Sequence, residues 1–356
     1  MFNYFFLLTL IVVNFCYALP RFAVQNASSC IACHVNPTGG GLRNDYGTNV
    51  VSLEELPFER WLDKGNEDWD GYIGDHLQIG GEFRLQGFQY NNSDTTRKTT
   101  FFPMQADIFT NLKLNNHAEI FTKIGIRGKS SINVDYWALL KNLSQNVWIK
   151  VGRALPNFGL QLDDHTSFIR GGNYSRSHLG SEKEGLLFGP FLHSPTILEL
   201  GVPMYGGLQW TSSMSTGLVY MSEELTNLTT QFNYTSNIND NITYMGSISY
   251  MQEENFSMMG ISGGIAFNNF TWTFEVDQAE NWIENNTTSL AIYDEIAWKV
   301  LQGVHLIGKY DFFDPKIDWQ TGSISRYTIG AELFPLNILE IKLQIRMNQI
   351  EGDNVS

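Results

Sequence analysis

The sequence has little cysteine, no long apolar run after its first segment and no cluster of basic residues. Three of the 356 residues are cysteine. Acidic residues outnumber basic ones, 37 to 23, and the formal net charge is −14. A chain with this charge and no basic patch does not suit a phosphate backbone, which excludes nucleic acid as the partner. The lack of a later run of about 18 apolar residues excludes a spanning helix downstream.

The first segment, residues 1–18, is apolar and carries no charged side chain. It is typical of a secretory signal peptide that is cleaved after Ala18. An N-terminal membrane anchor is the alternative, but Pro20 and Arg21 end the run at a length that is marginal for spanning. Cleavage would discard Cys16 and place Cys30 and Cys33, the remaining cysteines, in an oxidising compartment.

The pattern of apolar and polar residues changes near residue 77. Residues 19–76 are irregular and rich in Gly, Asn, Pro and Asp, with one candidate short helix at 52–65. Beyond them, the stretch NILEIKLQIRMNQI (337–350) alternates apolar and polar residues, and FTWTFEVD (270–277) does the same. A period of two predicts strands with one apolar and one polar face. Less regular runs occur at 81–90, 102–114, 117–128, 146–152, 242–252, 257–267, 288–299, 303–313 and 324–334.

Long alternating strands with aromatic residues near their ends are typical of a transmembrane β-barrel. A large soluble β-sandwich or propeller would also alternate, but fewer charged residues would face inward than LEIKLQIR (339–346) shows. We therefore predict an all-β fold, an outer-membrane barrel over residues 77–350 with about 16 strands at roughly 17 residues per strand and turn. Residues 351–356 are a C-terminal tail.

The direction of the strands gives a second count. If the first strand runs outward, 91–98 and 314–323 are outer loops, and the turns at 115, 301 and 335 are periplasmic. The last visible strand then ends outside the cell, which makes the strand number odd. Bacterial barrels normally have even numbers, so either a strand is miscounted or the final strand is missing from the sequence.

Cys30-Ile31-Ala32-Cys33-His34 is the attachment pattern of a c-type haem. Two thiols on one turn of chain reach the two vinyl groups of one porphyrin, and the next residue brings an imidazole to the iron. The alternatives are a disulfide, a thioredoxin-like redox pair and half of a zinc site. A redox pair would require a βαβ context, and a zinc site would require two more soft ligands. We predict one covalent haem c, with His34 as the proximal ligand and VNPTGGG (35–41) folding back over it.

The sixth ligand of the iron is not fixed by the motif. His165, Met104 and His76 are the candidates, and an iron that is open or ligated by water is the alternative. Each candidate alone also has an ordinary explanation, because a lone methionine on a strand usually packs and a lone histidine usually faces the lumen or a loop.

The stretch ALPRFAVQNASSCIACH (18–34) resembles the N-terminus of the fused outer-membrane cytochrome-porins. These are monohaem barrels that include iron oxidases of iron-oxidising bacteria. The shared residues are Ala18, Pro20, Phe22, Ala23, Gln25, Cys30, Cys33 and His34, and the pattern departs at Val24, Asn26 and Ala27. The resemblance covers about 17 residues and implies an electron path across the outer membrane. The next residues, VNPTGGGLRNDYG, differ from the iron oxidases, which leaves the substrate open.

Three hypotheses follow from the sequence. The first is a Gram-negative outer-membrane protein whose haem segment, 19–76, plugs the barrel at the periplasmic side or in the lumen. It would transfer electrons between a periplasmic cytochrome or other carrier and an extracellular redox substrate, with iron, and hence an iron-oxidase-like activity, as one candidate. The second is a passive porin whose haem segment is a plug or sensor. The third is a soluble β protein with a disulfide between Cys30 and Cys33.

Overall fold

The structure is a computed structural model that describes residues 20–58, 71–92, 95–127, 131–162, 164, 166–172, 185–186, 194–239, 241–319 and 322–351. The sixteen strands are β1 Tyr72–Ile73, β2 Leu77–Asn92, β3 Thr95–Asn115, β4 Ala118–Arg127, β5 Ser131–Leu140, β6 Trp148–Arg153, β7 Thr196–Pro203, β8 Leu208–Thr216, β9 Leu225–Asn239, β10 Ile242–Glu253, β11 Phe256–Phe267, β12 Phe270–Glu280, β13 Thr288–Leu301, β14 Val304–Asp314, β15 Ile324–Leu336 and β16 Leu339–Ile350.

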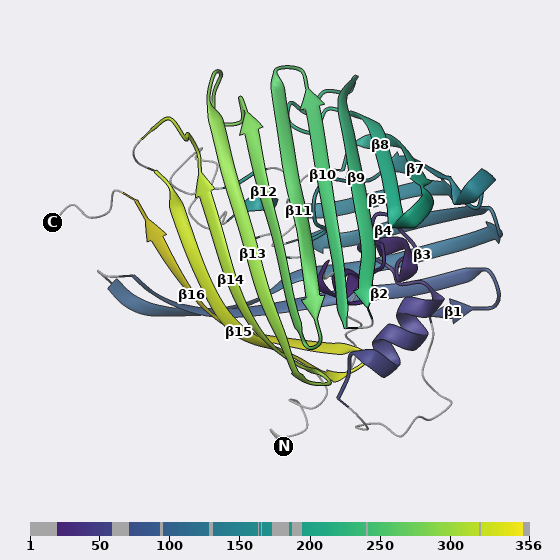
Figure 1. Cartoon of the computed structure of the whole chain (residues 1–356), viewed down its shortest axis with the longest axis horizontal. Coiled ribbons are helices and arrows are strands. Elements are labelled where there is room, and N and C mark those ends of the chain that lie inside the picture. The colour runs from purple at the N-terminus through teal and green to yellow at the C-terminus, as the bar shows by residue number, and fades with distance from the viewer. Residues whose placement is uncertain are drawn as a thin grey trace.

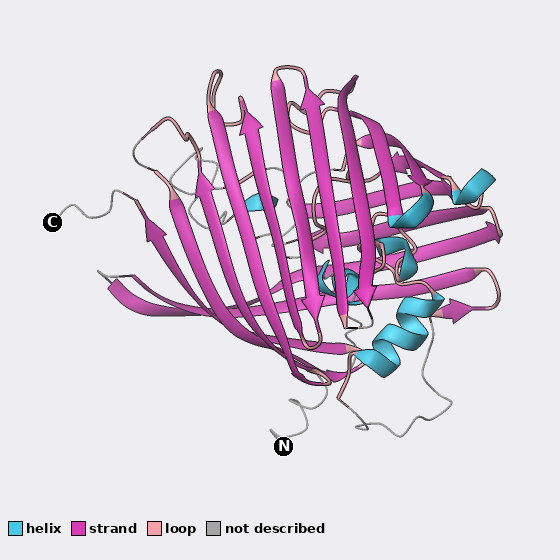
Figure 2. Ribbon diagram, viewed as in Figure 1, coloured by secondary structure: helices cyan, strands magenta, loops and turns pink. Residues whose placement is uncertain are grey.

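Helix is confined to short pieces, as Figure 2 shows. They are the α-helix α2 Pro20–Gln25, the π-helix η2 Gly47–Glu55, and the 3₁₀ turns η1 Cys30–Ala32, η3 Ser144–Asn146, η4 Phe168–Arg170 and η6 Tyr205–Gly207. The predicted helix at 52–65 overlaps the end of η2, but its part from residue 59 lies outside the described residues, as does the predicted signal peptide at 1–18. No helix in the described part of the chain is long and apolar enough to cross a membrane.

All strands belong to one antiparallel sheet in which each strand pairs with the next one in the sequence. The sheet curls around the N-terminal part of the chain (Figure 1). Register is continuous over long stretches, so that Phe270 of β12 lies opposite Trp298 of β13 and their rings stack at 5.6 Å. The prediction of an all-β barrel with about 16 strands is confirmed.

The connections alternate between the two ends of the sheet. The turns after β3, β13 and β15, predicted to share one end, do so, and we call this the short-turn end. The connections after β2 and β14 share the other end. Because β2 extends to Asn92 and β3 starts at Thr95, most of the predicted loop at 91–98 is strand instead. The strand β1 has only two residues, so the long strands run from β2 to β16, and β16 ends away from the short-turn end, as the parity count predicts.

Burial across the wall is the reverse of that in a soluble sheet. On β12, Thr271 and Glu275 are 1% and 0% exposed, whereas Phe270 and Trp272 are 50% and 43% exposed. On β16, Ile345 is 68% exposed. Polar side chains therefore face the lumen and apolar side chains face outward, as a wall in contact with lipid requires. The soluble alternative predicted the opposite arrangement.

The described residues of the connection between β6 and β7 (154–162, 164, 166–172, 185–186 and 194–195) fold into the lumen, and we call them the inserted segment. The backbone N–H of Leu160 donates to Glu275 on β12 over 2.8 Å, and the hydroxyl of Ser167 donates to Asp311 on β14 over 2.6 Å. Phe158 and Phe168 are buried in an apolar cluster with side chains of β10 to β14. These contacts bind the inserted segment to the far wall of the barrel.

Residues 20–58, which we call the N-terminal segment, enter the lumen from the short-turn end, where η2 lies beside the strand ends (Figure 1). The helix α2 packs against β10, β11 and β12, and Gln25 donates to Thr271 over 2.7 Å. On the other side, Val35 and Leu42 belong to an apolar cluster with aromatic and aliphatic side chains of β3 to β7. The segment therefore spans the lumen from one wall to the other (Figure 1).

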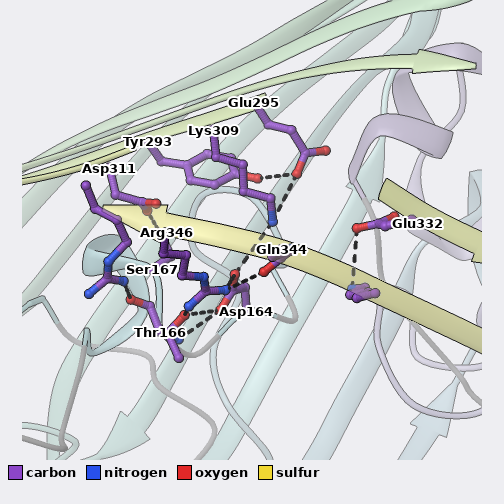
Figure 3. A network of polar contacts seen from close by, with 12 residues as sticks. Asp164, Thr166, Ser167, Tyr293, Glu295, Lys309, Asp311, Glu332, Gln344 and Arg346 are labelled. Carbon is purple, nitrogen blue, oxygen red and sulfur yellow. Dashed lines mark hydrogen bonds and ion pairs between the residues drawn. The ribbon is translucent and has the colours of Figure 1, made fainter. Parts of the chain in front are cut away.

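A buried polar network joins the two internal segments to the wall, as Figure 3 shows. Arg21 of α2 pairs with Glu295 on β13 at 3.1 Å and also with Glu332 on β15. Lys309 lies 3.2 Å from Glu295 and 3.6 Å from Asp164 of the inserted segment. Burial of so many charges is tolerated because each of these has a partner of opposite sign.

Candidate functional site

The Cys-Ile-Ala-Cys-His stretch forms one tight turn. The backbone N–H groups of Cys33 and His34 both donate to the carbonyl of Cys30, over 3.1 and 3.0 Å. The side-chain amide of Asn44 donates to the carbonyls of Ile31 and Ala32 over 2.9 and 3.0 Å. The turn is therefore fixed by the chain ten residues downstream, and it presents two thiols and one imidazole within five residues.

The chain after His34 folds back on the turn, as the glycine-rich sequence predicted. Val35 donates to Leu42 over 3.0 Å, and His34 and Arg43 form an antiparallel bridge. The fold requires three successive residues with positive φ, Gly39 to Gly41, at 95°, 76° and 66°. Glycine alone adopts such values without strain.

Two glycines allow the backbone to approach the cysteines closely. A Cβ atom at Gly39 would lie 3.0 Å from the Sγ atom of Cys30, and one at Gly47 would lie 2.1 Å from the carbonyl oxygen of Cys33. The space next to each cysteine is therefore kept by the absence of a side chain.

Both thiols and the imidazole line one cavity inside the barrel. Its lining comes from the N-terminal segment (Pro20, Phe22, Ala23, Asn26, Ser28, Ser29, Cys30, Cys33, His34, Pro37, Thr38, Arg43, Gly47, Val51, Leu56), the inserted segment (Asn157, Gly159, Leu160, Gln161) and the wall (Gln209, Thr211, Gln231, Asn233, Met245, Ser247, Phe334).

Burial sets the protonation of the three groups. It raises the pKa of the Cys30 thiol to about 11, and it also raises the pKa of the Cys33 thiol. Burial, and then the nearby Arg43 guanidinium, lower the pKa of His34 to about 4, although the carbonyls of Gly41 and Leu42 favour its charged form. The imidazole is thus neutral at neutral pH, which is the form that ligates a metal.

The donors present fit a c-type haem. Cys30 and Cys33 are free thiols rather than a disulfide, and His34 Nδ1 is buried without a hydrogen-bond partner in the described structure. Among the described residues, no group of three or more His, Cys, Asp or Glu side chains could hold a metal ion by itself. Two thiols and one neutral imidazole on a shared cavity are the protein groups that a covalent haem needs.

A buried ion pair holds both internal segments at the cavity. Lys150 of β6 lies 2.7 Å from Glu199 of β7, and both side chains are fully buried. The Lys150 Nζ also donates to Asn36 Oδ1 and Thr38 Oγ1 of the N-terminal segment, over 3.2 Å each. Glu199 accepts from the backbone N–H of Asn157 in the inserted segment over 3.0 Å. Sequence reasoning missed this pair, because no local signal links these positions.

Of the three predicted sixth ligands, the two that the structure describes do not line this cavity. Met104 lies on β3 at an irregularity of the register with β2 and is not a lining residue. His76 is exposed, and its Nδ1 lies 3.0 Å from the carbonyl oxygen of Lys113. His165 lies outside the described residues. The lining includes one methionine that sequence reasoning missed, Met245. Its only signal in the sequence is an apolar residue on the polar face of β10.

The comparisons with known proteins concern the barrel. No protein-family profile and no curated protein sequence matches the chain. Among solved structures, a loop-deletion mutant of the outer-membrane protein OmpT of Vibrio cholerae is similar, with TM-score 0.53 and 11% identity over 77% of this chain and 94% of that one. An anion-selective porin from Comamonas acidovorans and OprB of Pseudomonas putida each give TM-score 0.52 and 9% identity over 77% of this chain and 89% of theirs. The fold is therefore that of a porin-like barrel.

Proposed function

We propose that this chain is a monohaem cytochrome-porin of the Gram-negative outer membrane. It carries one covalent haem c in the barrel lumen and passes single electrons between a periplasmic electron carrier and an extracellular redox substrate. The observation that carries the proposal is the convergence of Cys30, Cys33 and His34 on one cavity inside a porin-like barrel. A haem held there supplies a one-electron carrier in a layer that excludes charge.

The residues of the site have separate roles in this proposal. Cys30 and Cys33 hold the haem, since each thiol adds its S–H across one vinyl double bond without an oxidant. His34 ligates the iron as the neutral imidazole that its burial favours. Phe22, with the other apolar residues of the lining, excludes water from one side, and low solvent access is one of the levers on the potential of a haem.

The partners follow from charge and position. The net charge of −14 suits a basic periplasmic carrier. The inserted segment reaches the haem cavity at Asn157 to Gln161, and a Cβ at Gly39 would lie 3.5 Å from Gln161. The two internal segments therefore meet at the cavity. We infer that electrons pass between the haem and the extracellular substrate through this contact. Iron(II) is one candidate, from the N-terminal resemblance.

The test is haem staining of the protein on a denaturing gel together with its oxidised and reduced absorption spectra. The protein as isolated is expected to stain and to give a c-type spectrum with one haem per chain. A Cys30→Ser, Cys33→Ser double variant is expected to keep the heat-modifiable mobility of a folded barrel and to lose the stain. If the unaltered protein forms a folded barrel but does not stain for haem, the proposal is wrong.

Electron flow is then measured in liposomes that contain the protein and an internal redox dye. An external reductant is expected to reduce the dye through the unaltered protein and not through the double cysteine variant. Solute leakage without dye reduction would favour the second candidate, a passive porin with a haem-bearing plug. That candidate is favoured by the polar lumen wall, where side chains such as Gln231 and Ser247 line the cavity.

Alanine at Gly39 is expected to impair haem attachment, whereas alanine at Gly40 is not. Both positions have positive φ, so both variants bear a strain of about 1–2 kcal/mol. Only at Gly39 does the new Cβ meet Cys30, at 3.0 Å from its Sγ; at Gly40 nothing lies within 4 Å. The measurement is the ratio of haem absorbance to protein. Equal haem loss in both variants would attribute the effect to strain alone.

A further inference from the structure

The ligands that haem iron takes from proteins are His, Met, Cys and Tyr side chains. The described cavity lining contains only four residues of these types: Cys30, Cys33, His34 and Met245. The two thiols are committed to covalent attachment and His34 to the proximal position under the proposed function. Met245 is thus the one remaining lining residue of a ligating type.

The position of Met245 is fixed by the barrel wall. It lies on β10 near the short-turn end, paired with Thr235 of β9 and Gly264 of β11. Gly264 packs against α2, since a Cβ there would lie 2.8 Å from Cγ2 of Val24. Two residues before Met245, the hydroxyl of Thr243 donates to the carbonyl of Val24. The wall at Met245 is therefore bonded to the same segment that carries the cysteines.

Met245 differs in chemistry from its neighbours on the lumen face of β10. The other inward residues of β10 near the cavity are Thr243, Ser247 and Ser249, all hydroxyl-bearing. A thioether is a weak ligand that competes with water only where it is held in place and partly desolvated. Met245 is partly buried and sits on a strand paired on both sides, which meets both conditions.

One other donor lies close to the cavity. His305 of β14 is 2% exposed, and its Nδ1 is buried without a hydrogen-bond partner in the described structure. Its ring contacts Phe22 and Phe334 with centroid distances of 5.7 and 5.8 Å. Both phenylalanines line the cavity and His305 does not. His305 would need these rings to move before it reached a haem, whereas Met245 already faces the cavity.

We propose that the thioether of Met245 is the second axial ligand of the haem held by Cys30, Cys33 and His34. The inference rests on the proposed function. A methionine opposite a histidine raises the potential of a c-type haem relative to two histidines. The site is therefore suited to accept electrons from a donor of fairly high potential.

The test is optical spectroscopy and redox titration of the purified holoprotein. The unaltered protein is expected to be low-spin in both oxidation states, with the weak red band that a methionine sulfur gives to ferric haem. Met245→Leu is expected to become high-spin in the ferric state while keeping its covalent haem. Met245→His is expected to stay low-spin, to lose the sulfur band and to titrate at a lower potential.

Met251→Leu is the matched control. Met251 lies on the same face of β10 but is fully buried in the apolar cluster around Phe158 and Phe256. It is expected to leave the spectrum and the potential unchanged. A Met245→Leu protein that remains low-spin overturns the inference, and loss of the low-spin state in His305→Leu alone would transfer the role to His305. An unaltered protein without haem would instead overturn the proposed function.

Discussion

Arg170→Met is expected to release the inserted segment from the barrel wall. Arg170 is 3% exposed, and its Nη2 donates to both carboxylate oxygens of Glu275 over 2.9 Å. It also donates to the carbonyls of Leu160 and Ile169, over 3.2 Å from Nε and 2.7 Å from Nη1, and lies 3.6 Å from Asp277. Removing one partner of a buried pair costs about 3–5 kcal/mol, because the remaining charge is left uncompensated.

Permeability of the barrel is the measurement for Arg170. Liposomes with Arg170→Met are expected to admit larger neutral sugars than liposomes with the unaltered protein, while the heat-modifiable mobility on a gel shows that the wall still forms. A double variant, Arg170→Met with Glu275→Gln, removes the stranded charge and is expected to recover part of the barrier. Equal permeability of all three proteins would show that Arg170 does not hold the inserted segment in place.

Lys150→Met is expected to destabilise the barrel by about 3–5 kcal/mol and to lower its haem content, because it leaves Glu199 buried and unpaired. The loss also frees Asn36 and Thr38, the residues just after the haem motif, since Lys150 donates to both. Stability is measured as the temperature at which the folded band disappears on a gel, and haem as absorbance per protein.

A second substitution separates the two effects of Lys150. Lys150→Met with Glu199→Leu removes both charges from the interior and is expected to recover much of the thermal stability. It does not restore the bonds to Thr38 or to Asn157, so the haem content is expected to stay low. Lys316→Met is the control, because Lys316 pairs with Glu284, whose side chain is 55% exposed, and is expected to have a small effect. Full recovery of haem in the double variant would contradict a positioning role.

The wall of this protein could be predicted because its signal is local. Alternation alone predicted the nine less regular runs. The run at 242–252, for example, corresponds to β10, which is found at Ile242–Glu253. Five strands, β1, β5, β7, β8 and β9, were not predicted. Serine, threonine and glycine interrupt the apolar face in several of them, as in LQWTSSMST (208–216), which weakens a period of two.

The interior could not be predicted in the same way. The haem motif was readable because its five residues are consecutive, and its cysteines do face a cavity. The side chains that surround the motif come from strands that are far away in the sequence. Lys150, which donates to Thr38, is more than 100 residues from it, and Met245 reaches the cavity from β10. Candidates for the sixth ligand were chosen by residue type and nearness in sequence, and neither property decides which side chains a barrel brings together.

The pairing of Arg21 joins the N-terminal segment to strands near the end of the chain. Its carboxylate partners, Glu295 and Glu332, lie on β13 and β15, and the second is 311 residues further along the chain. Every wall strand pairs with its sequence neighbour, so the sheet can grow by local steps. The N-terminal segment is synthesised first, but its ion pairs can form only once β13 and β15 are in place. Under the proposed function, we therefore expect the haem to be attached to the cysteines before the barrel is complete.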